Sequence, residues 1–162
     1  MELSTLNPTI IDVSSGFAVL PPVPGFSTNA ISKLAGVQLC AYIAAEHPEV
    51  TVVALHPGIV HTNIVDTAFS WAKHMALDSK SIAADVTGGE SDCWMVADEG
   101  LAHELVGGTA LFLSTPAAKF LSGRFVTANW DMEELVQRQD EIVKEDKLRM
   151  YCKGEFGPQQ FQ

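Results

Sequence analysis

The sequence predicts an α/β fold in which a parallel sheet of about three strands is flanked by helices. Two short apolar runs rich in β-branched residues, 9–13 and 50–55, lie on either side of a long apolar segment of helical character. A strand, a helix and a second strand joined in this way form a parallel pair with a right-handed crossover. A third run, 123–128, supplies another strand. The 162 residues fit one domain, 1–162, with a single core.

The first strand and helix come from the N-terminal third of the chain. Residues 9–13 are apolar apart from Asp12, a pattern typical of a strand covered on both faces. Ser27 or Thr28 is expected to cap the helix, which runs to about residue 46. Apolar residues occupy nearly its whole circumference, which predicts burial on more than one side. Gly36 would let another backbone approach closely.

The second half of the chain supplies the other elements. His47-Pro48 ends the first helix, the second strand follows, and 56–58 forms a turn. Residues 61–96 are expected to form a lid or substrate loop, since a long insertion between core elements usually binds ligand.

A helix from Asp98 to about Ser114 follows, and the pair Gly107-Gly108 suggests tight packing against the sheet. Asp131 and Glu134 resemble a capping box at the start of a final helix. Residues 153–162 are expected to form a loose tail.

Composition excludes several classes of function. The formal charge of −10 argues against nucleic acid and anionic lipid as partners. No apolar run is long enough to span a membrane, and no secretory signal is visible, which favours a cytoplasmic protein. Three scattered cysteines suit free thiols in a reducing compartment. The histidines and cysteines lack metal-ligand spacing, so no metal site is expected.

Polar side chains gather where the predicted strands end. Ser14 and Ser15 follow the first strand, and His56 and Gly58 follow the second. Ligands bind at the carboxyl ends of parallel strands in such sheets. Asn29 and Lys33 lie four residues apart, so both point from one helix face toward the serine pair.

The order of four motifs resembles the C-terminal half of a classical short-chain dehydrogenase/reductase, especially its fungal branch. These motifs are IIDVSS, the Ser32-Lys33 pair, HPGIVHT from His56 to Thr62, and FLSGRFVTANWD from Phe120 to Asp131. The resemblance implies a truncated Rossmann-like sheet. It also implies that Ser15 holds a substrate carbonyl and that Lys33 is the active-site lysine.

Two departures change what the resemblance implies. Asn29 stands where the family has its catalytic tyrosine, and a carboxamide cannot supply a titrating proton. The sequence also lacks a glycine-rich strand-to-helix turn, the part that holds a dinucleotide pyrophosphate, so no cofactor is expected. Pro57, Gly58 and Thr62 match the family segment that lies beside the nicotinamide.

Hydrogen-bond donors and a positive charge can still stabilise a developing oxyanion. The first hypothesis is therefore a cofactor-independent cyclase, isomerase or lyase that acts on an apolar carbonyl compound such as a secondary-metabolite intermediate. Its candidate catalytic residues are Ser15, Asn29 and Lys33. Its candidate substrate-binding residues are Ser14, His56, Gly58, His61, Thr62 and Trp94.

Two other hypotheses stay open. In the second hypothesis, the chain is an NAD(P)-dependent oxidoreductase fragment that needs an N-terminal half. In the third, it is a non-catalytic interaction module. Ser14 and Ser15 can simply end a strand, Asn29 can bond local backbone, and His56 and His61 can be structural. An exposed apolar strand edge also predicts a homodimer or higher oligomer that buries it.

Overall fold

The three predicted strands form one parallel sheet. The structure, a computed structural model, describes residues 8–20, 22, 25–58 and 102–151. Its strands are β1 (Thr9–Val13), β2 (Thr51–His56) and β3 (Arg124–Thr127), in the spatial order β1-β2-β3. Ile11 pairs with Val53, which pairs with Arg124 on its other side. This confirms the α/β prediction of a three-stranded parallel sheet flanked by helices.

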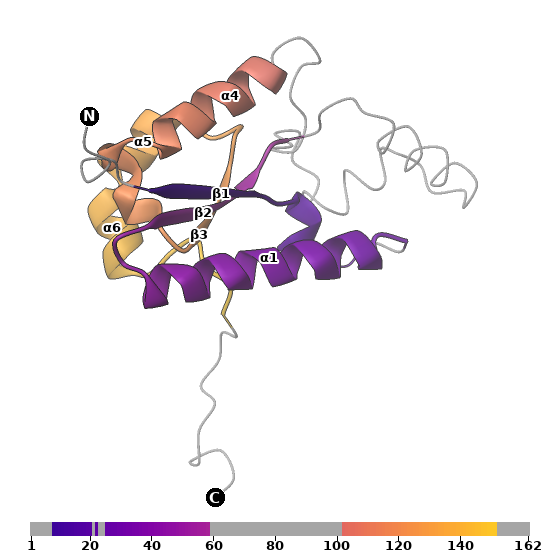
Figure 1. The fold of residues 1–162 in the computed structure, drawn as a ribbon. Helices are drawn as coiled ribbons and strands as arrows, with labels where there is room; N and C mark the ends of the chain where they lie inside the picture. The colour runs from indigo at the N-terminus through magenta and orange to yellow at the C-terminus, as the bar shows by residue number, and fades with distance from the viewer. Residues whose placement is uncertain (1–7, 21, 23–24, 59–101, 152–162) are drawn as a thin grey trace, which may run out of the picture.

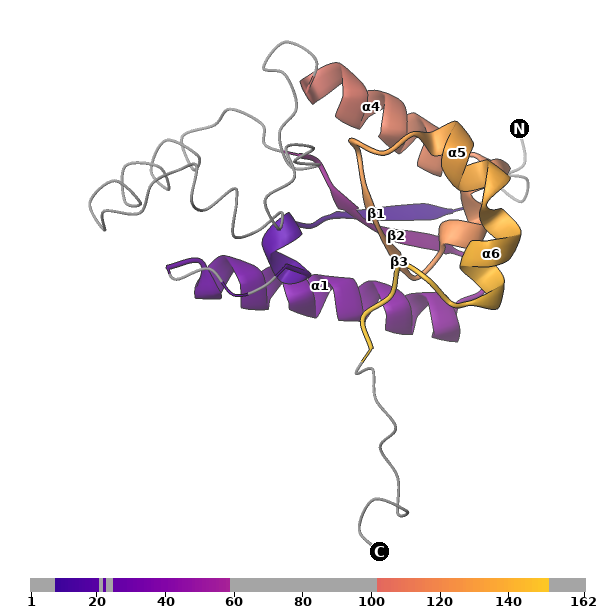
Figure 2. The same ribbon diagram turned by 180° about the vertical axis from the view of Figure 1, so that it is seen from behind.

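Helices cover both faces of the sheet (Figure 1). The long helix α1 (Ser27–Glu46) runs along one face, and the short 3-10 helix η2 (Gly16–Ala18) lies between β1 and α1 in the chain. The opposite face carries α4 (Ala102–Leu113), η3 (Pro116–Leu121), α5 (Met132–Gln137) and α6 (Gln139–Lys144). Figure 2 shows the same two layers from behind.

Alternate residues of the central strand, β2, belong to two hydrophobic clusters, one on each face of the sheet. Val52 and Ala54 pack with Val37 and Cys40 of α1, whereas Val53 and Leu55 face the other helices. The second cluster is the larger, and its other buried members are Leu113, Ala118, Leu121, Val126, Ala128, Leu135 and Ile142. All six residues of β2 are buried, so this strand holds the two layers together.

The structure corrects two expectations about α1. Phe26 occupies the N-cap position and makes no side-chain capping bond, so neither Ser27 nor Thr28 caps the helix. The helix is also buried on one side only, since Ile31, Leu39 and Tyr42 are 69%, 59% and 65% exposed. No second layer lies outside α1 within the described part of the chain, so its outward apolar residues meet solvent.

The expectation that β1 is covered on both faces is likewise wrong. Ile10 and Val13 are 45% and 53% exposed, because within the described residues β1 pairs with β2 alone and forms an edge of the sheet. The other edge differs, since the Phe125 N–H donates to the Leu148 carbonyl at 2.9 Å. The segment after α6 therefore covers β3.

The glycine pair of α4 does not pack tightly. A Cβ built on Gly107 or on Gly108 would meet nothing within 4 Å, and both residues are exposed. The expectation of close packing against the sheet is therefore wrong, because the pair lies on the solvent side of a helix whose inward residues are Thr109 and Leu113.

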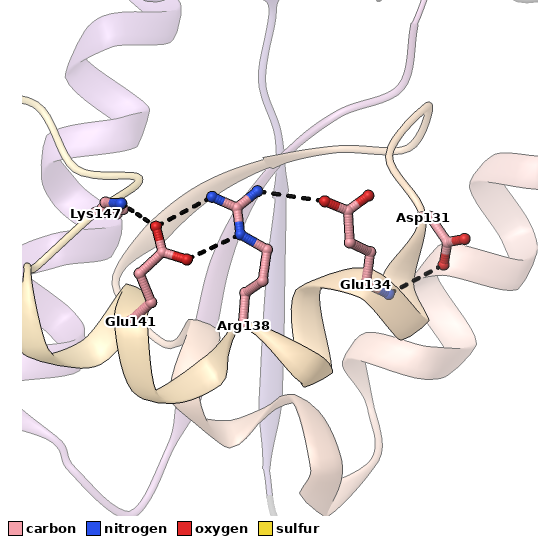
Figure 3. Close-up of polar contacts among 5 residues, drawn as sticks. All are labelled: Asp131, Glu134, Arg138, Glu141 and Lys147. Carbon is pink, nitrogen blue, oxygen red and sulfur yellow. Dashed lines mark hydrogen bonds and ion pairs between the residues drawn. The ribbon is translucent and has the colours of Figure 1, made fainter.

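The predicted cap at Asp131 is confirmed, but the helix that follows is divided. The Asp131 carboxylate accepts hydrogen bonds from the Glu133 and Glu134 N–H groups at 2.8 and 3.2 Å. One helix then ends at Gln137 and the next begins at Gln139. Arg138, at the junction, reaches Glu134 at 3.3 Å and Glu141 at 3.0 Å, and Lys147 adds a second cation to Glu141 (Figure 3).

Some expectations fall outside the described residues. They are the lid at 61–96, the expected start of α4 at Asp98 and the tail at 153–162. Among the helices that the structure describes, none combines the length and the apolar character needed to cross a bilayer.

Candidate functional site

The carboxyl ends of the three strands bring polar side chains into one row. His56 ends β2 and is in register with Thr127, which ends β3. Ser14 lies one residue beyond the Val13–Leu55 pair, and its N–H donates to the Leu55 carbonyl at 2.7 Å. Ser14, His56 and Thr127 are at most 5% exposed. These three residues lie at the carboxyl ends of the strands, the edge at which parallel sheets bind ligands.

Ser15 leaves the sheet edge in an extended conformation and caps η2. Its Oγ accepts a 3.4 Å hydrogen bond from the Phe17 N–H. A hydroxyl has one proton to donate besides its acceptor lone pairs, and this contact uses an acceptor. The half-buried Ser15 can therefore donate to a ligand oxygen while it holds the turn.

Lys33 reaches from α1 to the end of β1. Its Nζ donates a 2.7 Å hydrogen bond to the Val13 carbonyl, two residues before Ser15. An ammonium carries three donors, so this contact leaves capacity for a ligand. The structure thus brings the Lys33 ammonium to the carboxyl end of β1, which Ser14 and Ser15 follow in the chain. We call this end of β1, with Ser15 and Lys33, the Ser15 corner.

Asn29 lies one helical turn before Lys33 and is exposed. Its backbone carbonyl accepts a 2.9 Å hydrogen bond from the Ser32 hydroxyl, which fixes the first turns of α1. Residues four apart share a helix face, so the amide of Asn29 and the ammonium of Lys33 are presented on the same side.

Gly36 provides a notch in α1, and the Asp12 side chain fills it. A Cβ on Gly36 would lie 2.6 Å from Asp12 Oδ2, so the expected close approach is made by a side chain rather than by a backbone. Burial, together with the Asp12 charge, raises the pKa of the Cys40 thiol to about 11. Cys40 is therefore a packing residue and not a thiolate nucleophile at neutral pH.

His56 is a neutral, buried imidazole. Desolvation lowers its pKa from 6.5 to about 4, and its ring stacks on Phe125 with centroids 6.4 Å apart. A neutral ring offers one donor and one acceptor. His56 can accordingly support the site as a hydrogen-bonding group but not as a cation.

Gly58 shapes the turn after β2. Its φ of +79° lies in the left-handed region, and a Cβ there would meet Asn129 Oδ1 at 2.8 Å. Only glycine fits both constraints without strain. The Pro57-Gly58 turn is therefore packed against the residues that follow β3.

The structure places six of the nine predicted site residues, namely Ser14, Ser15, Asn29, Lys33, His56 and Gly58. His61, Thr62 and Trp94 lie outside the described residues. Thr127 and Asn129 at the same edge were missed. Ligands bind at the carboxyl ends of parallel strands, and both residues stand at or just after the end of the third predicted strand, so the same argument would have found them.

The described residues give no pyrophosphate site for a nicotinamide dinucleotide. Pro57 and Gly58, which the resemblance places beside the nicotinamide, form the turn after β2. The pyrophosphate needs a strand-to-helix turn with three closely spaced glycines. The described connection from β1 to α1 carries Gly16 and Gly25, which are too far apart to form such a turn. Within the same residues no group of three or more His, Cys, Asp or Glu could hold a metal ion.

Comparison with curated proteins finds relatives over most of this chain. It is 31% identical over 152 residues to short chain dehydrogenase andI of Emericella variicolor, covering 93% of this chain and 44% of the relative. A short chain dehydrogenase/reductase of Claviceps purpurea is 33% identical over 152 residues, 91% of this chain and 41% of the relative. Short chain dehydrogenase mpl6 of Monascus purpureus is 29% identical over 144 residues, with 88% and 41% covered.

No family model matches the chain. The chain spans between 41% and 44% of the length of these three relatives. Over that part it is short-chain-dehydrogenase-like, in agreement with its parallel sheet and with the order of its motifs.

Proposed function

We propose that this short-chain-dehydrogenase-like chain is an enzyme that activates the carbonyl group of an apolar compound without hydride transfer. Its chemistry is of the cyclase, isomerase or lyase type, and its place is the cytoplasm. The observation that carries the proposal is the hydrogen bond from Lys33 to Val13, which holds the ammonium at the end of β1, at a residue two positions before Ser15 in the chain.

The proposed roles follow from the donors at this corner. The Ser15 hydroxyl and the Asn29 amide donate to the carbonyl oxygen, and Lys33 adds positive charge. Asn29 occupies the place of the tyrosine in the family pattern, so a proton donor that could complete a reduction is replaced by one that only donates a hydrogen bond. Such donors favour the oxyanion of an enolate.

The simplest reaction of this kind is enolisation. The C–H bond next to the carbonyl breaks, its proton passes to a solvent base, and its electron pair forms the carbon–carbon double bond of the enolate. The displaced π electrons move onto the carbonyl oxygen, where the donors hold them. Reprotonation at carbon, elimination or ring closure then completes an isomerase, lyase or cyclase reaction.

Deuterium exchange tests the proposal directly. 2-Tetralone, an apolar ketone with acidic α-protons, is incubated with the protein in D₂O and followed by NMR. We expect faster α-deuteration with the protein than without it. Ser15→Ala and Asn29→Ala should slow the protein-dependent rate by roughly 10²–10³-fold, as loss of an oxyanion donor does. Added NADPH should change nothing.

Ser114→Ala is the matched control. The Ser114 hydroxyl donates to the Ala110 carbonyl at the exposed end of α4, at the opposite face of the sheet. This variant should keep the wild-type exchange rate. Equal rates in wild type, Ser15→Ala and Asn29→Ala would refute the proposal.

A second candidate is an NAD(P)-dependent oxidoreductase that is completed by a further polypeptide segment. It is favoured by the names of the relatives and by the share of their length that this chain spans. The open edge of β1 could pair with another strand. Enhanced nicotinamide fluorescence on titration with NADPH would support this candidate. If neither exchange nor NADPH binding is detected, the interaction module is the remaining function.

We also propose that the chain forms a homodimer or higher oligomer. Ile31, Leu39 and Tyr42 form an exposed apolar row on α1, and Ile10 and Val13 are exposed on β1. The opposite edge, at β3, already bonds to Leu148. A monomeric mass by light scattering at micromolar concentration would contradict this proposal, and Tyr42→Glu should shift an oligomer toward monomer.

A further inference from the structure

Two aromatic rings meet beside the Ser15 corner. Phe17 lies in η2, two residues after Ser15, and Phe26 is the N-cap of α1, three residues before Asn29. Their rings are stacked, with centroids 4.3 Å apart and planes inclined by 26°. The pair therefore joins the two chain segments that carry the hydrogen-bond donors.

Hydrogen bonds hold the backbone at both phenylalanines, and the rings stack on each other. The Phe17 N–H donates to Ser15 Oγ, and the Phe26 carbonyl accepts from the Ala30 N–H at 2.8 Å, in the first turn of α1. Both phenylalanines are half-buried, so each residue keeps some surface in contact with solvent. A ring held in this way presents an apolar, planar surface at little further cost in conformational entropy.

We infer that the Phe17–Phe26 pair recognises an aromatic ring attached to the carbonyl group of the substrate. This inference rests on the proposed function and narrows its substrate class from apolar ketones to aryl ketones. A planar ring can extend the existing stack or meet its edge, and its quadrupole complements those of the two phenyl rings. A saturated ring of the same size fills similar volume but lacks that complementarity.

Acetophenone and 1-cyclohexylethanone form a matched pair of probes. They share the carbon skeleton and the methyl ketone, and they differ only in the saturation of the ring. Dissociation constants are measured from ¹⁵N chemical-shift changes of the labelled full chain. We expect the wild type to bind acetophenone roughly threefold to tenfold more tightly, the range that aromatic pairs contribute beyond buried area.

Phe17→Leu should abolish this preference. Its affinity for 1-cyclohexylethanone should change by less than about twofold, since leucine keeps most of the apolar surface. Phe26→Leu should behave in the same way and serves if Phe17→Leu fails to fold. Phe112→Leu is the control, because Phe112 is a half-buried phenylalanine of α4 that packs on the opposite cluster. That variant should keep the preference.

Asn29→Ala separates this inference from the proposed function, because the hydrogen bond between Asn29 and Ser32 is made through the Asn29 backbone carbonyl and does not involve either ring. Loss of the donor to the carbonyl oxygen should weaken the binding of both ketones equally and leave the aromatic preference intact. If Asn29→Ala binds both ketones as the wild type does while Phe17→Leu loses the preference, the proposed function fails and the aromatic site stands. A wild type that binds the two ketones equally, or binds neither, overturns the inference. So does an equal loss of both ketones in Phe17→Leu.

Discussion

The ammonium of Lys33 donates a 2.7 Å hydrogen bond to the carbonyl of Val13, twenty residues earlier in the chain. This contact ties the first half of α1 to the end of β1. The Phe17–Phe26 stack and the Asp12 side chain at Gly36 link α1 to the same part of the chain. The Lys33 hydrogen bond adds a polar contact to this junction at the end of β1, where the Val13 side chain is exposed.

Lys33→Met is expected to loosen the junction while keeping an unbranched apolar stem. The loss of one partly exposed hydrogen bond should lower the free energy of unfolding by about 0.5–1.5 kcal/mol. Urea denaturation measures the change. Lys144→Met is the control, because Lys144 is exposed in the last turn of α6, and its effect should stay within about 0.5 kcal/mol. Equal effects of the two variants would show that the Lys33 contact does not stabilise the fold.

Gly58 and Gly107 should respond in opposite directions to alanine. Gly58 has φ +79°, and a Cβ there would lie 2.8 Å from Asn129 Oδ1, so Gly58→Ala should cost about 1–2 kcal/mol or more. Gly107 lies inside α4 with open space around it. Gly107→Ala should therefore stabilise the protein by about 0.5–1 kcal/mol.

Thermal unfolding of the two glycine variants gives the comparison, since each serves as the control for the other. A lower Tm for Gly107→Ala would mean that, in solution, other atoms occupy the space into which the alanine Cβ would extend. An unchanged Tm for Gly58→Ala would mean that the turn relaxes away from its left-handed conformation.

The sequence was most informative where one local rule determined the outcome. The strands were predicted within a residue or two, because β-branched runs bounded by polar turns have few alternatives. The Lys33 ammonium reaches the carboxyl end of β1, which agrees with its helical spacing, and its catalytic role stays a prediction. The exposure of Ile31, Leu39 and Tyr42 was missed, because apolar residues on a helix do not reveal what covers them.

Other errors arose from contacts between distant segments. The apolar pattern of the last helix continues across Arg138, and only the three-dimensional arrangement shows the break there. The notch at Gly36 was expected, but its occupant, the Asp12 carboxylate, is set by the register between β1 and α1. The aromatic pair of Phe17 and Phe26 is separated by a Pro/Gly-rich loop whose course no periodicity predicts.

Asp131→Ala should remove the N-cap of α5. The carboxylate accepts from two N–H groups that have no partner within the helix, and loss of such a cap typically costs about 1 kcal/mol. Urea denaturation measures the cost. Asp140→Ala is the comparison, because Asp140 is an exposed acid of α6 outside the ion pairs of Figure 3. Asp131 is expected to be the more costly position, and the reverse order would contradict the assignment of the cap.

His56 predicts a pH dependence of stability with a definite sign. Burial lowers its pKa from 6.5 to about 4, so between these values the unfolded chain binds a proton that the folded protein excludes. The free energy of unfolding should therefore fall as the pH falls, by up to about 1.4 kcal/mol per unit. Urea denaturation from pH 7 to pH 5 should show a shallower slope for His56→Gln than for the wild type. Ser114→Ala, which changes an exposed hydroxyl at the end of α4, should keep the wild-type slope. Equal slopes in wild type and His56→Gln would mean that the imidazole protonates without leaving its buried row.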